Sequence, residues 1–225
     1  IIFSKSQLSR IIEVQDNWDL PKTYSVNRRI EILIKKNIIN EAIIELSNKQ
    51  VIQRYYSRQP SIYKYSTSLK PNAYLSHSSA LYLNGLISTP PKVIYITYEQ
   101  SNKQPHIQDL IQSNIDDAFA KPQRTSSLEA QVGKKIIKFL NGKNTQRLGV
   151  EYTEFEDETL EVTNMERTLI DVTVRPAFAG GAKNVLKAYK IALKRGISVE
   201  IIIRMIKELS YFYPYHQAIG FYETL

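Results

Sequence analysis

The chain has 225 residues, of which 43% are hydrophobic, and its formal net charge is +8 at pH 7. This length suits one large domain or two small ones, and no run approaches the roughly 18 apolar residues that a transmembrane helix needs. The absence of cysteine excludes disulfides, cysteine nucleophiles and thiolate metal sites, and no signal peptide is visible, so we expect a cytoplasmic protein.

The positive charge is concentrated near the amino end. Residues 1–70 hold 12 Lys and Arg against 6 Asp and Glu, whereas residues 71–225 hold 18 against 16. Concentrated positive charge is typical of proteins that bind a polyanion, because Lys and Arg neutralise its phosphates. An anionic membrane is the competing partner, but membrane-binding segments usually expose a bulky apolar helix face. We therefore predict a DNA-binding domain in 1–70, a second domain in 71–225, and no membrane partner.

Two helices are predicted within the first forty residues. Ser4 and Gln7 have the spacing of a capping box, and apolar residues at helical spacing continue the first helix over 5–15. A connector containing Pro21 follows, and then residues 23–36 place their apolar side chains on one side of a helical wheel. A helix, a short turn and a basic helix, in this order, indicate a helix-turn-helix.

The outer face of the 23–36 helix suits a DNA major groove, because Arg and Asn match base edges while Lys and Ser reach phosphates. We assign the base edges to Tyr24, Ser25, Asn27 and Arg28. The phosphate contacts are assigned to basic residues of this helix and of the segment behind it, namely Arg29, Lys35, Lys36, Lys49, Arg54, Arg58 and Lys64. The alternative interpretation is an ordinary solvated face, since surface helices are usually charged.

The segment behind the basic helix predicts two short strands. Residues 51–57 and 61–66 are rich in tyrosine and other β-favouring residues, and Pro60 lies between the two runs. Two strands after a recognition helix form the wing of a winged helix. A winged helix usually has three helices, and only two are clear in this sequence.

Beyond a boundary near residue 70, helical and strand patterns mix. We predict helices at 77–85, 114–120, 182–195 and 199–210, a helix opened by a Thr163–Glu166 capping box and ended by Pro176, and a strand at 92–98. Asn141-Gly142 predicts a hairpin within 134–155, and the aromatic residues of 211–222 are expected to pack on the core. The predicted fold class is therefore α+β, with an N-terminal winged helix-turn-helix and a larger C-terminal mixed α/β domain.

No pattern in the sequence indicates catalysis. It has no G-x-S-x-G elbow and no glycine-rich phosphate loop, and its three histidines are not spaced like zinc ligands. Asp116-Asp117 and the acids within 154–158 are candidate metal ligands for a winged-helix nuclease. No lysine follows the second group at the position that a restriction-type nuclease requires, and a solvated acidic turn is the better interpretation. We expect a protein that is not an enzyme and that uses no metal or cofactor.

Three segments resemble the C-terminal domain of AbiEi-type antitoxins. They are YLSHSSALYLNGL followed by PPKVIYI (74–86 and 90–96), NIDDAFAKPQRTS (114–126), and VTNMERTLIDVTVRPAFAGGAKNVLKAY (162–189) with its E-R-T-L-I-D centre. Asn84 departs from the family pattern, which has histidine at this position. With the basic helix-turn-helix in front of them, the three segments extend the resemblance over nearly the whole chain.

The resemblance implies an antitoxin of a bacterial type IV toxin–antitoxin system associated with abortive phage infection. Its winged helix would bind inverted repeats in its own promoter and repress the operon, with a pair of protomers on the DNA as one arrangement. Its C-terminal domain would counteract a nucleotidyltransferase-like toxin without a stable complex. The candidate surface for this is Glu166, Arg167 and Asp171, although we favour a helix cap with an internal ion pair as their role.

Two other functions stay open from the sequence. The first is a metal-dependent nuclease that uses the acids named above. The second is a non-enzymatic module whose basic domain binds RNA or an acidic protein. Incubation with plasmid and metal tests the first, and a comparison of duplex DNA with structured RNA separates the second from DNA binding, because the A-form major groove is too narrow for a helix to read.

Overall fold

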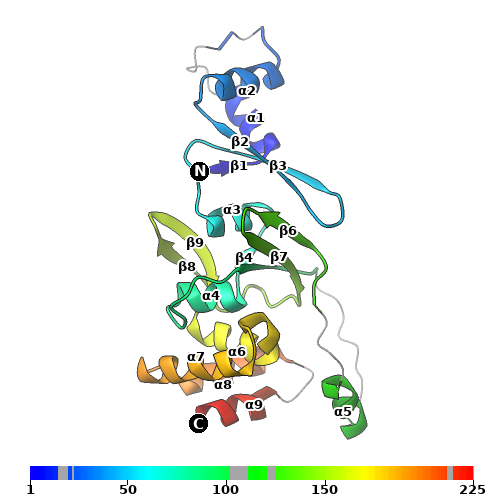
Figure 1. The fold of residues 1–225 in the computed structure, drawn as a ribbon, viewed down its shortest axis with the longest axis vertical. Helices are drawn as coiled ribbons and strands as arrows, with labels where there is room; N and C mark the ends of the chain where they lie inside the picture. The colour runs from blue at the N-terminus through cyan, green and yellow to red at the C-terminus, as the bar shows by residue number, and fades with distance from the viewer. Residues whose placement is uncertain (15–19, 22, 102–110, 121–124, 212–214, 225) are drawn as a thin grey trace.

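The computed structural model describes residues 1–14, 20–21, 23–101, 111–120, 125–211 and 215–224. Figure 1 shows an elongated arrangement with helices of the amino-terminal part at one end, β-sheets in the middle and a helical layer at the other end. The described strands form one three-stranded and one six-stranded sheet. The predicted α+β class is therefore confirmed.

The amino-terminal part has five elements. They are β1 (Ile2–Phe3), α1 (Lys5–Val14), α2 (Val26–Lys35), β2 (Asn40–Glu45) and β3 (Val51–Tyr56). Their sheet has the order β1-β3-β2, and both strand pairs are antiparallel. The helices predicted at 5–15 and 23–36 and the strand predicted at 51–57 are confirmed as α1, α2 and β3.

Capping and a small core explain where these two helices lie. Ser4 and Gln7 form the expected capping box, since Ser4 N donates to Gln7 Oε1 at 2.8 Å and Gln7 N donates to Ser4 Oγ at 3.3 Å. Ser25 Oγ accepts a hydrogen bond from Arg28 N at 3.3 Å, so α2 begins at Val26. Beneath both helices, one apolar cluster joins them to the sheet: Leu8, Ile12, Ile30, Leu33, Ile39 and Tyr55.

The strand predicted at 61–66 is wrong, because these residues belong to the helix α3 (Ile62–Ser68). Ser61 caps this helix through its side chain. Tyr63 and Tyr65 alternate as strand residues do, but both are buried on α3, and Tyr63 packs edge-to-face on Phe155. Tertiary packing has overridden local β-propensity here. The partner of β3 is instead β2, so the hairpin turns over residues 46–50.

The six-stranded sheet is mixed. It consists of β4 (Tyr74–Leu75), β5 (Val93–Glu99), β6 (Glu129–Val132), β7 (Lys135–Gly142), β8 (Val150–Phe155) and β9 (Glu158–Thr163), in the order β6-β7-β5-β4-β9-β8. The pairs β5–β7 and β4–β9 are parallel, and the others are antiparallel. The strand predicted at 92–98 is confirmed as β5.

The hairpin turn predicted at Asn141-Gly142 is wrong. Both residues are the last of β7, where they pair with Tyr98 and Glu99 of β5. The two hairpins of this sheet turn at Gly133-Lys134 and at Glu156-Asp157. Glu156 and Asp157 both have positive φ, which a two-residue turn of this kind needs. The pairing of β7 with β5 outweighs the local Asn-Gly signal, because it extends from Ile136 to Gly142 along the whole of β5.

The remaining helices follow residue 76 in the chain. They are α4 (His77–Leu83), α5 (Gln112–Ala120), α6 (Met165–Val174), α7 (Ala182–Lys194), α8 (Val199–Leu209) and α9 (Tyr215–Glu223), with a 3₁₀ turn η1 (Pro176–Ala179). The five helices predicted after residue 70 are confirmed as α4, α5, α6, α7 and α8. The predicted Thr163–Glu166 box is displaced by one residue, because Asn164 Oδ1 accepts from Arg167 N at 3.0 Å.

The aromatic carboxyl end packs on the helical layer as expected. Tyr211, Tyr215 and Tyr222 contact its apolar core, and the ring of Tyr222 stacks on that of Tyr189 with centroids 5.2 Å apart. The side chain of Phe221 is exposed instead, and Phe212 and Tyr213 lie outside the described residues. The helix α9 therefore closes one side of this core.

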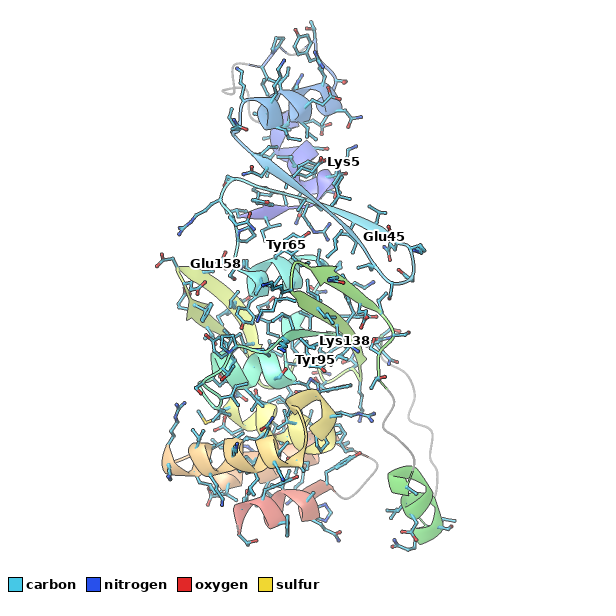
Figure 2. The ribbon with its side chains drawn as sticks, in the orientation of Figure 1. Lys5, Glu45, Tyr65, Tyr95, Lys138 and Glu158 are labelled. Atoms are coloured by element: carbon cyan, nitrogen blue, oxygen red, sulfur yellow. The ribbon has the colours of Figure 1, made fainter. Side chains whose placement is uncertain are left out.

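The β2–β3 hairpin leans on the six-stranded sheet. Leu46 forms an antiparallel bridge with Ala130, and Ser47 N donates to Glu129 O at 2.8 Å. Figure 2 shows Glu45, at the end of β2, far from α2 and beside the second sheet. Residues from both sides of the predicted boundary near residue 70 also share one apolar core. The division into 1–70 and 71–225 stays a prediction, and these contacts hold the two parts together.

Candidate nucleic-acid interface

The helix α2 lies at one end of the molecule (Figure 1). Its inner residues Ile30 and Leu33 are buried, whereas Asn27 and Arg28 are exposed on its first turn. Tyr24, which precedes the helix, is 43% exposed. The face that the sequence predicts to contact bases is therefore on the protein surface.

Positive charge predominates on α2 and its carboxyl cap. The charged residues are the cations Arg28, Arg29, Lys35 and Lys36 and the acid Glu31. Arg28 Nη1 lies 2.9 Å from Glu31 Oε2, and the two side chains are 63% and 62% exposed. An exposed pair of this kind contributes at most about 1 kcal/mol, so a base edge or phosphate can replace Glu31 as the partner of Arg28. Arg29 Nε donates to Tyr24 O at 3.0 Å, which holds the connector against the helix.

Lys49 lies in the β2–β3 turn, away from α2. Its backbone has a φ of +68°, and its side chain is 86% exposed, with Nζ 3.1 Å from Glu45 Oε1. The turn itself is fixed, because Ser47 Oγ donates to Ser127 O at 2.7 Å. Arg58 is exposed in the segment between β3 and α3. The structure does not bring Lys49 to the surface formed by α2.

Two of the predicted phosphate contacts already bind other residues of this chain. Arg54 donates from Nε to Ser68 O at 2.7 Å and from Nη1 to Gln53 O at 2.8 Å, and partial burial lowers its pKa. Lys64 lies on α3, and its Nζ donates to Thr159 O at 2.6 Å. These bonds tie β3 to α3 and α3 to β9. We therefore assign both side chains to the packing of the chain.

The acids considered for a nuclease are dispersed. Glu156-Asp157 is a hairpin turn, and Glu158 accepts hydrogen bonds from the main chain and hydroxyl of Ser61. Asp116 is exposed on α5, and the side chain of Asp117 lies outside the described residues. Within the described part of the chain, no group of three or more His, Asp and Glu is placed to hold a metal ion.

The residues of the candidate toxin-neutralising surface are mostly internal. Arg167 and Asp171 are only 5% and 6% exposed, and Arg167 Nε lies 2.8 Å from Asp171 Oδ1. Glu166 is half-buried in the first turn of α6. These three residues therefore cannot form one exposed surface, and the internal ion pair that we favoured is confirmed. The cap of α6 is Asn164, however, and not the box with Glu166.

No helix among the residues that the structure describes has both the length and the apolar character needed to cross a membrane.

Models of known protein families do not match this chain, and a search of curated proteins found no relative of it.

Proposed function

We propose that this chain binds double-stranded DNA through α2 and represses transcription. The observation that carries this proposal is the position of α2 at one end of the molecule (Figure 1). This capped cationic helix buries its apolar face and exposes its outer face. An α-helix fits the major groove, and recognition helices contact bases with their amino-terminal residues. Asn27 and Arg28 occupy this part of α2, with Tyr24 and Ser25 directly before it.

The order β1-α1-α2-β2-β3 supports a winged helix-turn-helix. Here α1 packs across α2, and the hairpin that follows α2 forms the sheet beneath both helices. We infer that this hairpin positions α2 without contacting DNA by its turn, because the turn is bonded to β6. The phosphate contacts then come from Lys35 and Lys36 at the carboxyl end of α2.

We further propose that the repressor is the antitoxin of a type IV toxin–antitoxin system. This step is supported by the resemblance of residues 74–96, 114–126 and 162–189 to AbiEi-type antitoxins. In this role the protein works in the cytoplasm, binds promoter inverted repeats as two protomers, counteracts a nucleotidyltransferase-like toxin without a stable complex, and performs no chemistry. Since Arg167 and Asp171 are buried, the neutralising surface lies elsewhere.

A binding titration tests the DNA proposal. The full chain is mixed with a fluorescent duplex from the promoter of its own reading frame, with a scrambled duplex of equal length, and with structured RNA at the same ionic strength. We expect the promoter duplex to bind most tightly and its affinity to fall steeply with salt, because phosphate contacts release counterions. Equal affinity for the two duplexes would contradict sequence-specific repression, and a preference for RNA would favour the RNA-binding alternative.

The antitoxin proposal has its own test. The antitoxin role requires that a nucleotidyltransferase-like toxin be encoded beside this chain. The chain is co-expressed with the protein of the adjacent reading frame, and growth is compared with that of cells making that protein alone. Restored growth is the expected result, and unchanged arrest would contradict the antitoxin role. Incubation of the pure protein with plasmid and Mg²⁺ separates both proposals from the nuclease alternative, which requires cleaved DNA.

A further inference from the structure

A cavity of about 540 Å³ lies in the larger part of the protein, remote from α2. The carboxyl ends of the parallel strands β5 and β7 line it through Thr97 and residues 140–142, and α6 lines it through Arg167 and Asp171. In open α/β sheets, ligands commonly bind at the carboxyl ends of parallel strands. A volume of this size is typical of small-molecule sites.

The charged lining of this cavity is mostly positive. Among the described residues it consists of Lys143, Arg167 and Arg175 against the single acid Asp171. Asp171 is neutralised by Arg167, which lies 2.8 Å away. The guanidinium of Arg175 makes no hydrogen bond or ion pair with any residue that the structure describes. Lys143 and Arg175 therefore carry two positive charges that have no acidic partner among the described residues, and Lys143 Nζ donates to Leu209 O and Ser210 O at 3.0 Å.

His77 supplies a neutral ring to the same wall. It is 8% exposed, and its Nδ1 lies 2.9 Å from Ser76 Oγ, which is 2.7 Å from Thr97 Oγ1. Within the described part of the chain, Nε2 has no hydrogen-bond partner. The backbone of His77 has a φ of +52°, a conformation that few residues other than glycine adopt and that is concentrated at functional sites.

Aromatic rings form much of the remaining wall. They belong to Tyr74, Phe178, Tyr211 and Tyr215. The ring of Phe178 packs edge-on against His77, with centroids 5.1 Å apart. The hydroxyls of Tyr74 and Tyr211 are already engaged within the protein, because Tyr74 donates to Glu99 Oε1 at 3.2 Å and Tyr211 donates to Asp171 Oδ1 at 3.5 Å. A planar organic group would therefore find ring faces on this wall.

We propose that this cavity binds an organic phosphate of mononucleotide size, with its phosphate held by Arg175 and His77 and its base packed against the aromatic wall. A phosphate monoester carries close to two negative charges at pH 7, which matches the two positive charges of the cavity lining that have no acidic partner. A carboxylate carries one negative charge and would leave one of these positive charges unmatched. Arginine suits phosphate because its planar guanidinium donates two parallel hydrogen bonds. Aromatic side chains stack on any nucleobase.

Isothermal titration calorimetry on the full chain tests this proposal. The probes are the four ribonucleoside 5′-monophosphates, inorganic phosphate, and the nucleosides without phosphate. We expect at least one monophosphate to bind with 1:1 stoichiometry, about tenfold or more tightly than inorganic phosphate, and the nucleosides not to bind. The absence of heat with all four monophosphates at millimolar concentration would overturn the proposal.

Two variants test whether the ligand binds in this cavity. Arg175→Met should weaken monophosphate binding about tenfold to 100-fold, since one charged hydrogen-bonding group is lost. The matched control is Arg204→Met, because Arg204 is exposed on α8 and does not line the cavity. Equal affinities of the two variants would overturn the assignment.

His77→Asn serves as the second cavity variant, since Asn tolerates positive φ, and it should also weaken monophosphate binding. Circular dichroism confirms that each variant is folded. Both cavity variants should bind promoter DNA as the unaltered chain does, so failure of this proposal does not affect the one on DNA.

Discussion

Arg167 and Asp171 form an ion pair inside the protein, with Arg167 Nε 2.8 Å from Asp171 Oδ1 and both side chains almost wholly buried. The two residues are four positions apart on α6, so they leave the same face of the helix. Arg167 Nη1 also donates to Leu148 O at 2.7 Å. The pair therefore joins α6 to the loop between β7 and β8, at the wall of the cavity.

Breaking this pair should destabilise the protein. Asp171→Asn leaves the buried guanidinium without its counter-charge, and we expect the free energy of unfolding to fall by about 3–5 kcal/mol. Urea denaturation followed by circular dichroism measures the change. Glu166→Gln is the control on the same helix and should cost far less, because Glu166 is half-buried and forms no ion pair among the described residues. Equal losses for the two variants would show that the pair does not stabilise the fold.

The stability of the protein should depend on the protonation of His77. Burial lowers the pKa of His77 from 6.5 to about 4; Asp171 opposes this shift, whereas Arg167 and Arg175 add to it. Because the unfolded chain binds this proton more readily than the folded chain, the contribution of His77 is complete above pH 6.5. It is lost progressively as the pH falls toward 4, and at pH 5 about 2 kcal/mol should be gone.

Urea denaturation at pH 7 and pH 5 measures this contribution. His77→Asn should lose about 2 kcal/mol less between the two pH values than the unaltered chain does. His216→Asn removes an exposed histidine of α9 and should keep the pH dependence of the unaltered chain. If His77→Asn also keeps it, another group is responsible for acid sensitivity.

Base recognition should depend on Arg28. Arg28→Ala removes the long cationic side chain of the first turn of α2, and we expect promoter binding to weaken by about 1–3 kcal/mol with loss of preference over scrambled DNA. A fluorescence-anisotropy titration of both duplexes measures the change. Lys49→Ala serves as the comparison and should leave both affinities unchanged, because the turn that carries Lys49 is bonded to β6. The reverse result would assign DNA contact to the hairpin turn.

Lys35 and Lys36 should contribute affinity without sequence preference. The double variant Lys35→Ala/Lys36→Ala should weaken promoter and scrambled duplexes equally, and it should reduce the dependence of log K on log salt by about 2. Titrations at several salt concentrations give this slope. The control Lys183→Ala/Lys187→Ala removes two exposed lysines of α7 and should leave the slope unchanged. Equal slopes for both double variants would mean that α2 does not bind the DNA backbone.

The sequence alone was sufficient to predict α2 and its outer face. Ser25 caps the helix through a bond to Arg28 N, and Ile30 and Leu33 face inward at helical spacing. Capping and amphipathic periodicity involve residues only a few positions apart, so they can be recognised without knowledge of the fold. The same holds for the capping box of α1 and for the other helices predicted along the chain.

The other features of the candidate DNA-binding surface, and the whole of the cavity, were decided by the tertiary structure alone. It placed Tyr63 in a helix, engaged Arg54 and Lys64 within the chain, and extended β7 through Asn141-Gly142. The cavity joins side chains from separate segments of the chain, among them Tyr74, His77, Lys143, Arg175 and Tyr211. Strand pairing, burial and ion pairing depend on contacts between residues that are distant in sequence. Local sequence patterns do not specify those contacts, so they could not be predicted from the sequence alone.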